Sequence, residues 1–493
     1  MATAETKLDR EILVLGAVVV VGTIMAILDA TIVNVAIPTL GRDFHTSIST
    51  IQWVMTGYLL AFASVIPLTG WASERFGAKR IWIAALLLFM VGSVLAGSAW
   101  SVEALIGFRV LQGLGGGLLM PVGQTILAQA AGPQRIGRVM SVVGVPMLLG
   151  PVFGPVIGGA IVDQASWRWI FFVNLPVGML AVLLALRLLP EAVPRLGRRL
   201  DLRGLVVLSP GLAIFVYGMS EAAGAGGFGS GRTIAGIAVG LALVGLFAVH
   251  ALRRGADALI DVSLFARRGF AAAAGTNLFV GIALFGALIL LPLYYQVVRG
   301  ESPLATGLLL VPQGVGAAVA MPIAGRLTDE IGARAVIPAG IVLALAGTAA
   351  YTQVGADTSY LFLSGALFLI GLGLGSTIVP AMGVAYQSVP REAVPQATSS
   401  INVIQRIAGS VGTALLAVVL QRSIASSLGI RSLGALPRDG RTHAAPALAD
   451  AFGTTFWVAF GLVAAALLPA LLLPRSRPRE EPGAAPASDG APS

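Results

Sequence analysis

Long blocks of apolar residues constrain the fold of this chain more than any other feature. Residues 12–36, 81–99, 204–219, 233–250 and 455–473 each run with almost no charged side chain. Such a block is close to the roughly 20 residues that cross a bilayer as a helix. Only helices and closed barrels satisfy every backbone group in lipid, and these blocks lack the alternation of barrel strands. The sequence therefore predicts an all-α membrane protein.

Composition supports this class. Hydrophobic residues make up 56% of the 493 residues and charged residues only 11%, against about 25% charged in a soluble domain. The first apolar block is too long for a cleavable signal peptide, and no small-residue cleavage site follows it, so we expect it to be the first span. We expect fourteen spans, roughly at 12–36, 50–71, 81–99, 103–122, 137–162, 168–189, 204–219, 233–251, 270–297, 305–324, 335–354, 360–383, 397–421 and 453–473.

We attribute the net charge of +9 to membrane topology and not to nucleic-acid binding. Lys and Arg concentrate in the odd-numbered turns and the terminal segments, which predicts a multi-pass protein with both termini in the cytoplasm. The chain has no cysteine and only three scattered histidines, so neither a disulfide framework nor a metal site is expected. No phosphate-binding loop is present. We expect no nucleotide, no cofactor and no enzymatic activity.

A short turn recurs in the two halves of the chain. Gly70-Trp-Ala-Ser-Glu-Arg-Phe-Gly77 and Gly325-Arg-Leu-Thr-Asp-Glu-Ile-Gly332 stand 255 residues apart, and in each a basic residue stands two positions after the second glycine. The recurrence predicts two duplicated bundles, and parallel repeats of this kind place a substrate cavity between them near mid-membrane. The offset is too long for six spans, so we expect an insert. The predicted parts are a six-helix bundle at 1–200, a two-helix insert at 201–255, a second six-helix bundle at 256–474 and a disordered cytoplasmic tail at 475–493.

Several motifs resemble those of the major facilitator superfamily. The two glycine turns resemble its loop motif, Leu105-x-x-x-Arg109-x-x-Gln112-Gly113 resembles its buried-arginine motif, and Gly150-Pro151-x-x-Gly154-Pro155-x-x-Gly158-Gly159 resembles the motif of its antiporters. Leu28-Asp29-x-Thr31-Ile-Val-Asn34 and Trp167-Arg-Trp-Ile-Phe-Phe-Val-Asn174 are similar to segments of the fourteen-span drug:proton antiporters of the EmrB/QacA type. The resemblance implies the major facilitator fold, location in the cytoplasmic (inner) membrane and export driven by the proton gradient.

The chain departs from that family in two places. Glu74 stands where the first glycine turn usually has Asp, whereas the second copy keeps Asp329. No carboxylate lies in span thirteen, where some exporters of dications carry one, and its absence argues against broad dicationic substrates.

Two charged residues inside spans are candidates for proton coupling. Asp29 is the only carboxylate placed well inside a span, where a charge costs about 2.5–3.5 kcal/mol on the mildest insertion scale. A carboxyl group there changes its protonation readily with its surroundings. Arg109 stays protonated and can compensate a carboxylate. The structural alternatives are a polar residue near the end of span one and an ion pair that only joins helices.

Candidate cavity residues are polar or aromatic side chains within spans. Asn402, Gln405, Arg406, Gly409, Ser410 and Thr413 form a polar stripe at helical spacing, for which helix packing is the alternative. The predicted substrate-cavity residues are Asn34, Tyr58, Gln112, Tyr295, Asn402, Gln405 and Arg406.

A third set of residues is expected to control conformation. Gly150, Gly154 and Gly158 recur every four residues and predict close helix approach, while Pro151 and Pro155 add bends. The charged turn residues are expected to hold one access state. The predicted gating residues are Gly70, Glu74, Arg75, Gly77, Arg80, Gly150, Pro151, Gly154, Pro155, Gly158, Gly159, Gly325, Asp329, Gly332 and Arg334.

These features predict an antiporter that exports amphipathic small molecules in exchange for protons by alternating access. The nearest alternative is a dedicated exporter of one self-made antibiotic, lipid or siderophore. A remote alternative is an intramembrane enzyme or sensor, which would be expected to carry histidine pairs, an acidic metal motif or an appended soluble domain.

Overall fold

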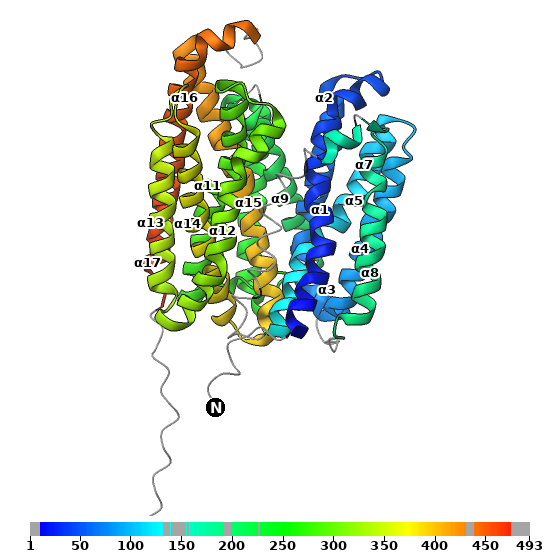
Figure 1. Ribbon diagram of the computed structural model, residues 1–493. Coiled ribbons are helices and arrows are strands. Elements are labelled where there is room, and N and C mark those ends of the chain that lie inside the picture. Colours follow the sequence, from blue (N-terminus) through cyan, green and yellow to red (C-terminus); the bar gives the residue numbers. More distant parts are fainter. Residues whose placement is uncertain are drawn as a thin grey trace, which may run out of the picture.

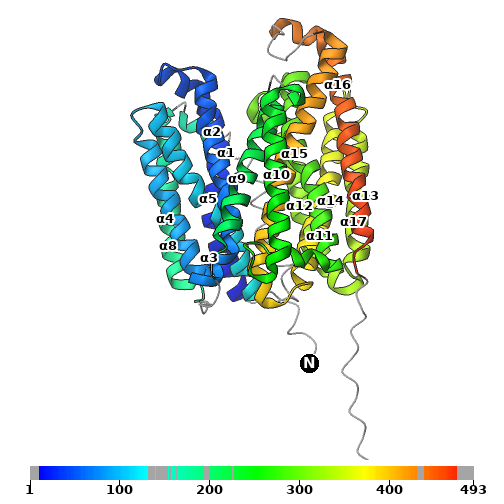
Figure 2. The same ribbon diagram turned by 180° about the vertical axis from the view of Figure 1, so that it is seen from behind.

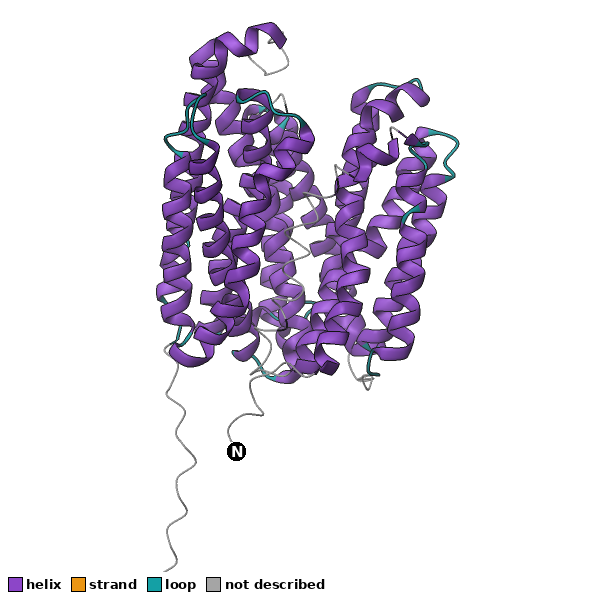
Figure 3. Ribbon diagram, in the orientation of Figure 1, coloured by secondary structure: helices purple, strands orange, loops and turns teal. Residues whose placement is uncertain are grey.

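A computed structural model describes residues 10–131, 139, 154, 157–162, 164–191, 199–224, 227–429 and 438–474. All regular structure in these residues is helical (Figure 3). Thirteen helices in the described part are long and apolar enough to cross a membrane. They correspond to thirteen of the fourteen predicted spans. The remaining one, at 137–162, lies mostly outside the described residues.

The structure describes seven helices in the first half of the chain. They are α1 (Arg10–Asp43), α2 (Ile48–Val65), α3 (Thr69–Phe76), α4 (Ala78–Gly97), α5 (Val102–Ala131), α7 (Trp169–Phe172) and α8 (Asn174–Leu188). A 3-10 turn at Ile66–Leu68 joins α2 to α3, so that the two form one span.

The rest of the chain contains a helical hairpin and a second set of long helices. The hairpin is α9 (Leu202–Ala223) and α10 (Gly231–Arg254). It is followed by α11 (Arg268–Leu293), α12 (Pro303–Ile331), α13 (Ala333–Tyr351), α14 (Tyr360–Gln387), α15 (Val394–Leu428), α16 (Arg438–Ala465) and α17 (Leu467–Leu471). A π-helical turn at Tyr294–Val298 extends α11.

The recurring glycine turn has the same backbone conformation in both halves. Gly77 ends α3 with φ 87° and ψ 135°, and Gly332 ends α12 with φ 88° and ψ 149°. L-residues with side chains rarely adopt this positive φ, which explains why the turn needs glycine. The next helix, α4 or α13, begins directly after each glycine. The sequence repeat is therefore also a structural repeat.

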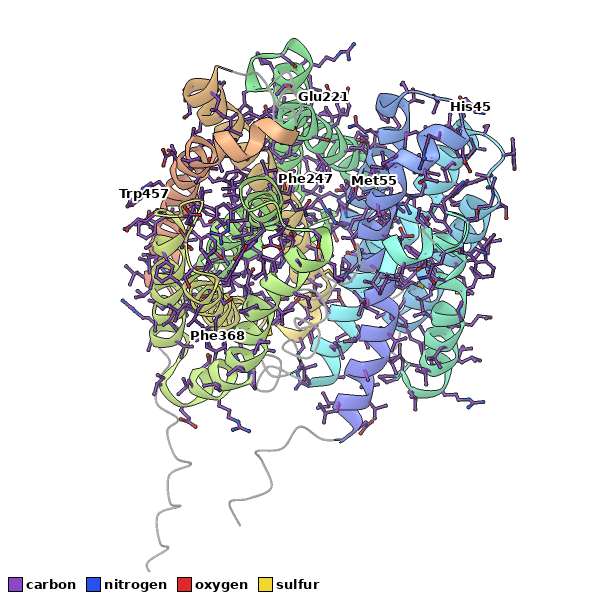
Figure 4. The ribbon with its side chains drawn as sticks, turned by 45° about the horizontal axis from the view of Figure 1, so that its top comes forward. His45, Met55, Glu221, Phe247, Phe368 and Trp457 are labelled. Atoms are coloured by element: carbon purple, nitrogen blue, oxygen red, sulfur yellow. The ribbon has the colours of Figure 1, made fainter. Side chains whose placement is uncertain are left out.

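Two groups of near-parallel helices stand side by side (Figures 1 and 2). One contains α1, α2, α4, α5 and α8, and the other contains α11 to α17. Figure 4, with the top brought forward, places His45 and Met55 on the first group and Phe247, Phe368 and Trp457 on the other side. At the lower end of Figure 1, where α1 begins, α3 packs on α15. We call this the lower end.

Helix α9 lies between the two groups and contacts both. It packs along its partner α10 and also against α2 and α15. The rings of Trp53 on α2 and Tyr217 on α9 stack 5.9 Å apart. Gln421 Nε2 on α15 donates to the Ala223 carbonyl at the end of α9 over 3.1 Å. The hairpin thus forms part of the wall between the groups. The domain boundaries given above stay a prediction.

Candidate functional site

A buried ion pair joins α1 to α5. Arg109 Nη1 lies 2.5 Å from Asp29 Oδ2, and both side chains are inaccessible to solvent. Two charges removed from water in this way must compensate one another, because an unpaired charge at this depth is strongly disfavoured. The structure therefore identifies Asp29 as the carboxylate that meets Arg109, which the sequence alone did not specify.

Uncharged polar side chains complete the coordination of this ion pair. Asp29 Oδ1 accepts from Gln112 Nε2 at 2.9 Å and from Asn174 Nδ2 at 3.1 Å. Gln112 Oε1 in turn accepts from Arg109 Nη1 at 2.7 Å. Ser93 Oγ accepts from both amides, at 3.2 and 3.0 Å, and donates to the Phe171 carbonyl at 2.9 Å. Four helices, α1, α4, α5 and α8, thus share one polar network.

Aromatic rings and a backbone carbonyl enclose the guanidinium of Arg109. Its central carbon lies 4.0 Å from the ring centre of Tyr58 and 5.7 Å from that of Phe171. Its Nε donates to the Val54 carbonyl at 3.3 Å, while Nη2 has no hydrogen-bond partner among the described residues. A cation over an aromatic face is favoured most when it is desolvated. The enclosure therefore surrounds the Arg109 side chain with protein groups and excludes solvent from it.

Glycines bring the helices of this network close together. A Cβ atom at Gly92 on α4 would lie 2.7 Å from the Gln112 backbone, and one at Gly113 would lie 2.5 Å from the Tyr58 carbonyl. Real side chains do not tolerate such contacts. In the Gln112-Gly113 motif, Gln112 therefore supplies hydrogen bonds to the ion pair, and Gly113 lets α5 pack closely on α2.

A cavity of roughly 270 Å³ lies between the two helix groups. Its walls come from α2, α5, α9, α11 and α15, so the hairpin contributes to it. The lining residues are Leu59, Phe62, Ile66, Met120, Pro121, Val216, Met219, Ser220, Ala223, Phe285, Asn402, Gln405, Arg406, Gly409, Ser410 and Thr413. All six residues of the predicted polar stripe on α15 are among them.

An aromatic chain connects the cavity to the ion pair. The guanidinium carbon of Arg406 lies 4.2 Å from the ring centre of Phe62. Phe62 contacts Tyr58, with ring centres 6.0 Å apart, and Tyr58 contacts Arg109. A ligand that moved Arg406 or Phe62 would therefore act on the side chains that hold Asp29.

Polar contacts join the two halves at the lower end. Gln396 Nε2 on α15 donates to Glu74 Oε1 at 3.4 Å, and Asn402 Nδ2 donates to Gln124 Oε1 at 2.8 Å. Ser399 Oγ donates to the Ile66 carbonyl at 3.1 Å. A Cβ atom at Gly70 would lie 3.1 Å from the Pro395 carbonyl. The two groups are thus closed against each other below the cavity.

The glycine motif of span five meets α1 close to the ion pair. A Cβ atom at Gly158 would lie 3.0 Å from Ile32 Cγ2, and one at Gly154 would collide with the Thr31 hydroxyl. A Cβ atom at Gly159 would meet nothing within 4 Å. The predicted close approach of this helix therefore occurs at Gly154 and Gly158. Gly150, Pro151 and Pro155 lie outside the described residues.

Four predicted cavity residues lie elsewhere. Tyr58 and Gln112 belong to the Asp29–Arg109 network. The Tyr295 hydroxyl hydrogen-bonds the Tyr351 hydroxyl at 2.9 Å inside the second helix group. Asn34 on α1 is exposed and does not line the cavity described here. Polarity within a span is common to all four, and the three-dimensional packing decides which face each one meets.

The structure describes the side chains of some, but not all, of the predicted charged turn residues. Glu74 faces Gln396, as described, whereas the side chain of Asp329 lies outside what the structure describes. Arg80 and Arg334 are exposed on the first turns of α4 and α13. Their predicted role in holding an access state stays a prediction.

Two groups of residues were not among the predicted site residues. Ser93 and Asn174 stand in the ion-pair network; the signal for Ser93 was a polar residue inside an apolar block, and Asn174 ends the motif that begins at Trp167. Asp201 is a second buried carboxylate, 2% exposed, just before α9. It accepts from the Gly204 and Leu259 amides at 3.1 Å each and lies 3.0 Å from His250 Nε2. Asp201 thus ties both helices of the hairpin to the segment that leads to α11.

A comparison with protein families decides the classification. The model described as Major Facilitator Superfamily matches residues 19–413. The chain belongs to the major facilitator superfamily. It is therefore a multi-pass membrane transporter, and the resemblance drawn from its motifs is confirmed.

Curated relatives of this major facilitator chain include named drug exporters. A "Multidrug resistance protein B homolog" from Mycobacterium tuberculosis is 39% identical over 96% of this chain and 92% of its own. "Multidrug export protein EmrB" of Haemophilus influenzae is 32% identical over 80% and 77%. A "Tetracenomycin C resistance and export protein" of Streptomyces glaucescens is 32% identical over 88% and 80%. These names support drug efflux.

A solved structure supports the fold. The proton:xylose symporter XylE superposes with a TM-score of 0.63 at 14% identity, over 94% of this chain and 96% of that one. At this identity the likeness concerns the fold alone. It agrees with the all-helical major facilitator architecture predicted from the sequence.

Proposed function

We propose that this transporter exports amphipathic small molecules from the cytoplasm in exchange for protons. The relatives named as multidrug resistance and export proteins support the class of cargo. The buried Asp29–Arg109 pair supports the coupling, and it is the observation on which the proposal rests. The cytoplasmic membrane is the proposed location, with both termini inside.

The proposed coupling uses Asp29 as the proton carrier. When Asp29 is ionised, Arg109, Gln112 and Asn174 all donate to it. A proton on Asp29 removes the ion pair and leaves Arg109 a buried cation without a counter-charge, which is strongly disfavoured. The guanidinium then has to find other acceptors or solvent, and α1, α2 and α5 rearrange with it. Proton binding thereby favours a different conformation of the bundle.

The described conformation fits the outward-facing half of such a cycle. The positive-inside distribution assigns the lower end to the cytoplasm. There the contacts Gln396–Glu74 and Asn402–Gln124 close the path below the cavity. Release of these contacts on α15 would open the cavity to the cytoplasm. Proton-dependent change at Asp29 and opening at α15 are linked through Tyr58, Phe62 and Arg406.

A reconstitution experiment tests the proposal. Protein in proteoliposomes is given an outwardly or inwardly directed pH gradient, and both the movement of a fluorescent amphiphile and the internal pH are followed. We expect amphiphile movement against its gradient, with protons moving the opposite way in step, and loss of both when a protonophore is added. A rate of amphiphile transport that does not depend on the pH gradient would overturn the antiport mechanism.

A dedicated exporter of one product is a second candidate. A relative named as a tetracenomycin C resistance and export protein favours it, and so does the lack of a carboxylate among the described residues that line the cavity. Transport of one compound, with no activity on a panel of chemically different amphiphiles, would establish this candidate over multidrug export.

A further inference from the structure

Among the described residues that line the cavity between the helix groups, Arg406 of α15 is the one charged side chain. The other described lining residues carry apolar or uncharged polar groups. Arg406 is partly accessible, and its contact with the Phe62 ring is the only hydrogen-bond, ionic or ring contact it makes to the described residues. A charged side chain inside a span normally pairs with a partner or faces a functional cavity. Arg406 faces the cavity.

Among the described residues, no carboxylate forms an ion pair or a hydrogen bond with Arg406. Asp29, the buried acidic residue of α1, is held by Arg109, Gln112 and Asn174. The part of span five that the structure does not describe also offers none, because residues 132–162 contain no Asp or Glu in the sequence. Arg406 thus has no counter-charge among the residues that the structure describes, and a bound anion would supply one.

We propose that this cavity selects amphiphiles that carry one negative charge, as a carboxylate, phenolate or sulfonate, on an aromatic body. The proposal rests on the exporter function above and names its substrate class. The anion pairs with the Arg406 guanidinium, whose planar donors match two oxygen atoms of a carboxylate. The Gln405 amide lies on the same face of α15 and, among the described residues, forms no hydrogen bond of its own.

The rest of the cavity suits the body of such a ligand. Phe62 and Phe285 offer aromatic faces, while Val216 and Met219 give α9 an apolar and adaptable surface. An aromatic ring over Phe62 also leaves the guanidinium free to turn from that ring to the anion. The hairpin helix α9 is on this account part of the substrate site.

The low polarity of the site strengthens its electrostatic preference for an anion over a cation. A charge interaction weakened by bulk water becomes several times larger where the effective dielectric constant falls. The same field that attracts an anion repels a cation of equal shape. The selectivity between anion and cation is thus set by attraction and by repulsion together.

Matched probes test the substrate class. We use 2-naphthylacetate, its neutral amide 2-naphthylacetamide and the cation 2-(2-naphthyl)ethylammonium, which share one ring system and differ in charge. Binding to the full chain in phosphatidylcholine nanodiscs is measured by competition against a labelled naphthoate at pH 7.5. We expect the carboxylate to bind at least about tenfold more tightly than the amide, and the ammonium to bind most weakly. Equal affinities, or tightest binding of the ammonium, would overturn the proposal.

Variants assign the preference to Arg406. In Arg406→Gln the carboxylate should lose its advantage over the amide, and Arg406→Lys should retain part of it because the charge remains. Arg422→Gln removes an exposed charge from the same helix and should keep the wild-type order of affinities. An unchanged anion preference in Arg406→Gln would overturn the assignment. The wild-type order of the three probes decides the substrate class even if a variant fails to fold.

Binding in nanodiscs needs no gradient, so it separates this inference from proton coupling. Anion preference without gradient-driven transport would support the substrate class and overturn the antiport mechanism. Gradient-driven transport without anion preference would support antiport and overturn the proposed substrate class.

Discussion

Asp29 and Arg109 form a buried ion pair with 2.5 Å between Oδ2 and Nη1, and Tyr58 covers the guanidinium at 4.0 Å. The pair connects the first helix of the bundle to the middle of α5. Because both groups are inaccessible to solvent, a change in the charge of either one has to be met by movement of the helices that carry them.

Neutralising Asp29 should uncouple transport from protons. In Asp29→Asn the side chain keeps its shape and an acceptor oxygen, so Gln112 or Arg109 can still donate to it, but the residue no longer binds or releases a proton. We expect gradient-driven export to fall at least about tenfold, a change of about 1.4 kcal/mol, in the proteoliposome assay. Glu103→Gln, which removes an exposed carboxylate at the start of α5, is the control and should transport like the wild type. Wild-type coupling in Asp29→Asn would exclude Asp29 as the proton carrier.

The fold was largely predictable because its physical cause is local. A run of about 20 apolar residues forms a spanning helix whatever its neighbours are, and thirteen predicted spans match described helices. The glycine turns were predictable too, since residues with side chains rarely adopt the positive φ found at Gly77 and Gly332. Both signals lie within a few residues of the feature they specify.

Site residues were predictable from the sequence only where helical spacing alone places them on one side of a single helix. The stripe from Asn402 to Thr413 lies along one side of α15, and all six of its polar or small residues reach the cavity. Contacts between residues on different helices could not be predicted from helical spacing. Asn174 meets Asp29 across 145 positions of sequence, and Tyr58 was assigned to the cavity although it packs on Arg109 instead. Which helix faces meet is decided by packing of the whole bundle.

Closure of the lower end can be trapped with a pair of cysteines. The native chain has no cysteine, so Glu74→Cys with Gln396→Cys introduces the only two thiols. Their parent side chains lie 3.4 Å apart, and a short bifunctional thiol reagent should join them, hold the lower end closed and stop transport. Reductive cleavage of the reagent should restore it. Glu74→Cys with Ser426→Cys, near the far end of α15, is the control and should not cross-link within one molecule. Cross-linking that leaves transport intact would show that α3 and α15 do not separate during the cycle.

A methyl group at Gly154 should disturb the helix that carries Asp29. The added Cβ would collide with Thr31, whose hydroxyl donates to the Leu28 carbonyl at 2.9 Å. Overpacking of this kind typically costs about 1–3 kcal/mol. We expect Gly154→Ala to lower both the melting temperature and the transport rate. Gly159→Ala adds the same group where nothing lies within 4 Å and should be nearly neutral. Equal effects of the two variants would contradict a specific contact with α1.

Removing one hydroxyl distinguishes a core tyrosine from a cavity residue. Tyr295→Phe deletes the hydrogen bond to Tyr351, which should lower stability by about 0.5–1.5 kcal/mol. Since Tyr295 does not line the described cavity, the relative transport of different amphiphiles should not change. Thermal unfolding and a substrate panel provide the measurements. An altered substrate profile would return Tyr295 to the substrate site.

Asp201 should anchor the α9–α10 hairpin in a pH-dependent way. Burial alone would raise the pKa of this carboxyl group, but hydrogen bonds from the Gly204 amide, the His250 ring and the Leu259 amide outweigh it and hold the pKa of Asp201 below its ordinary value. A carboxylate with a lowered pKa stabilises the fold above its ordinary pKa, and that stabilisation is lost as the pH falls through the lowered value.

Comparison of Asp201→Asn with the wild type tests this anchor. The variant turns one acceptor into a donor that faces other donors, which should cost about 1–3 kcal/mol at neutral pH. The difference in melting temperature should narrow as the pH falls below about pH 4, because the unfolded chain then takes up a proton at this position that the native carboxylate resists. Asp257→Asn, at an exposed residue of the next turn, should melt like the wild type throughout. A difference that does not narrow below about pH 4 would mean that the ionised carboxylate is not the source of the stabilisation, and the ionic anchor would then be wrong.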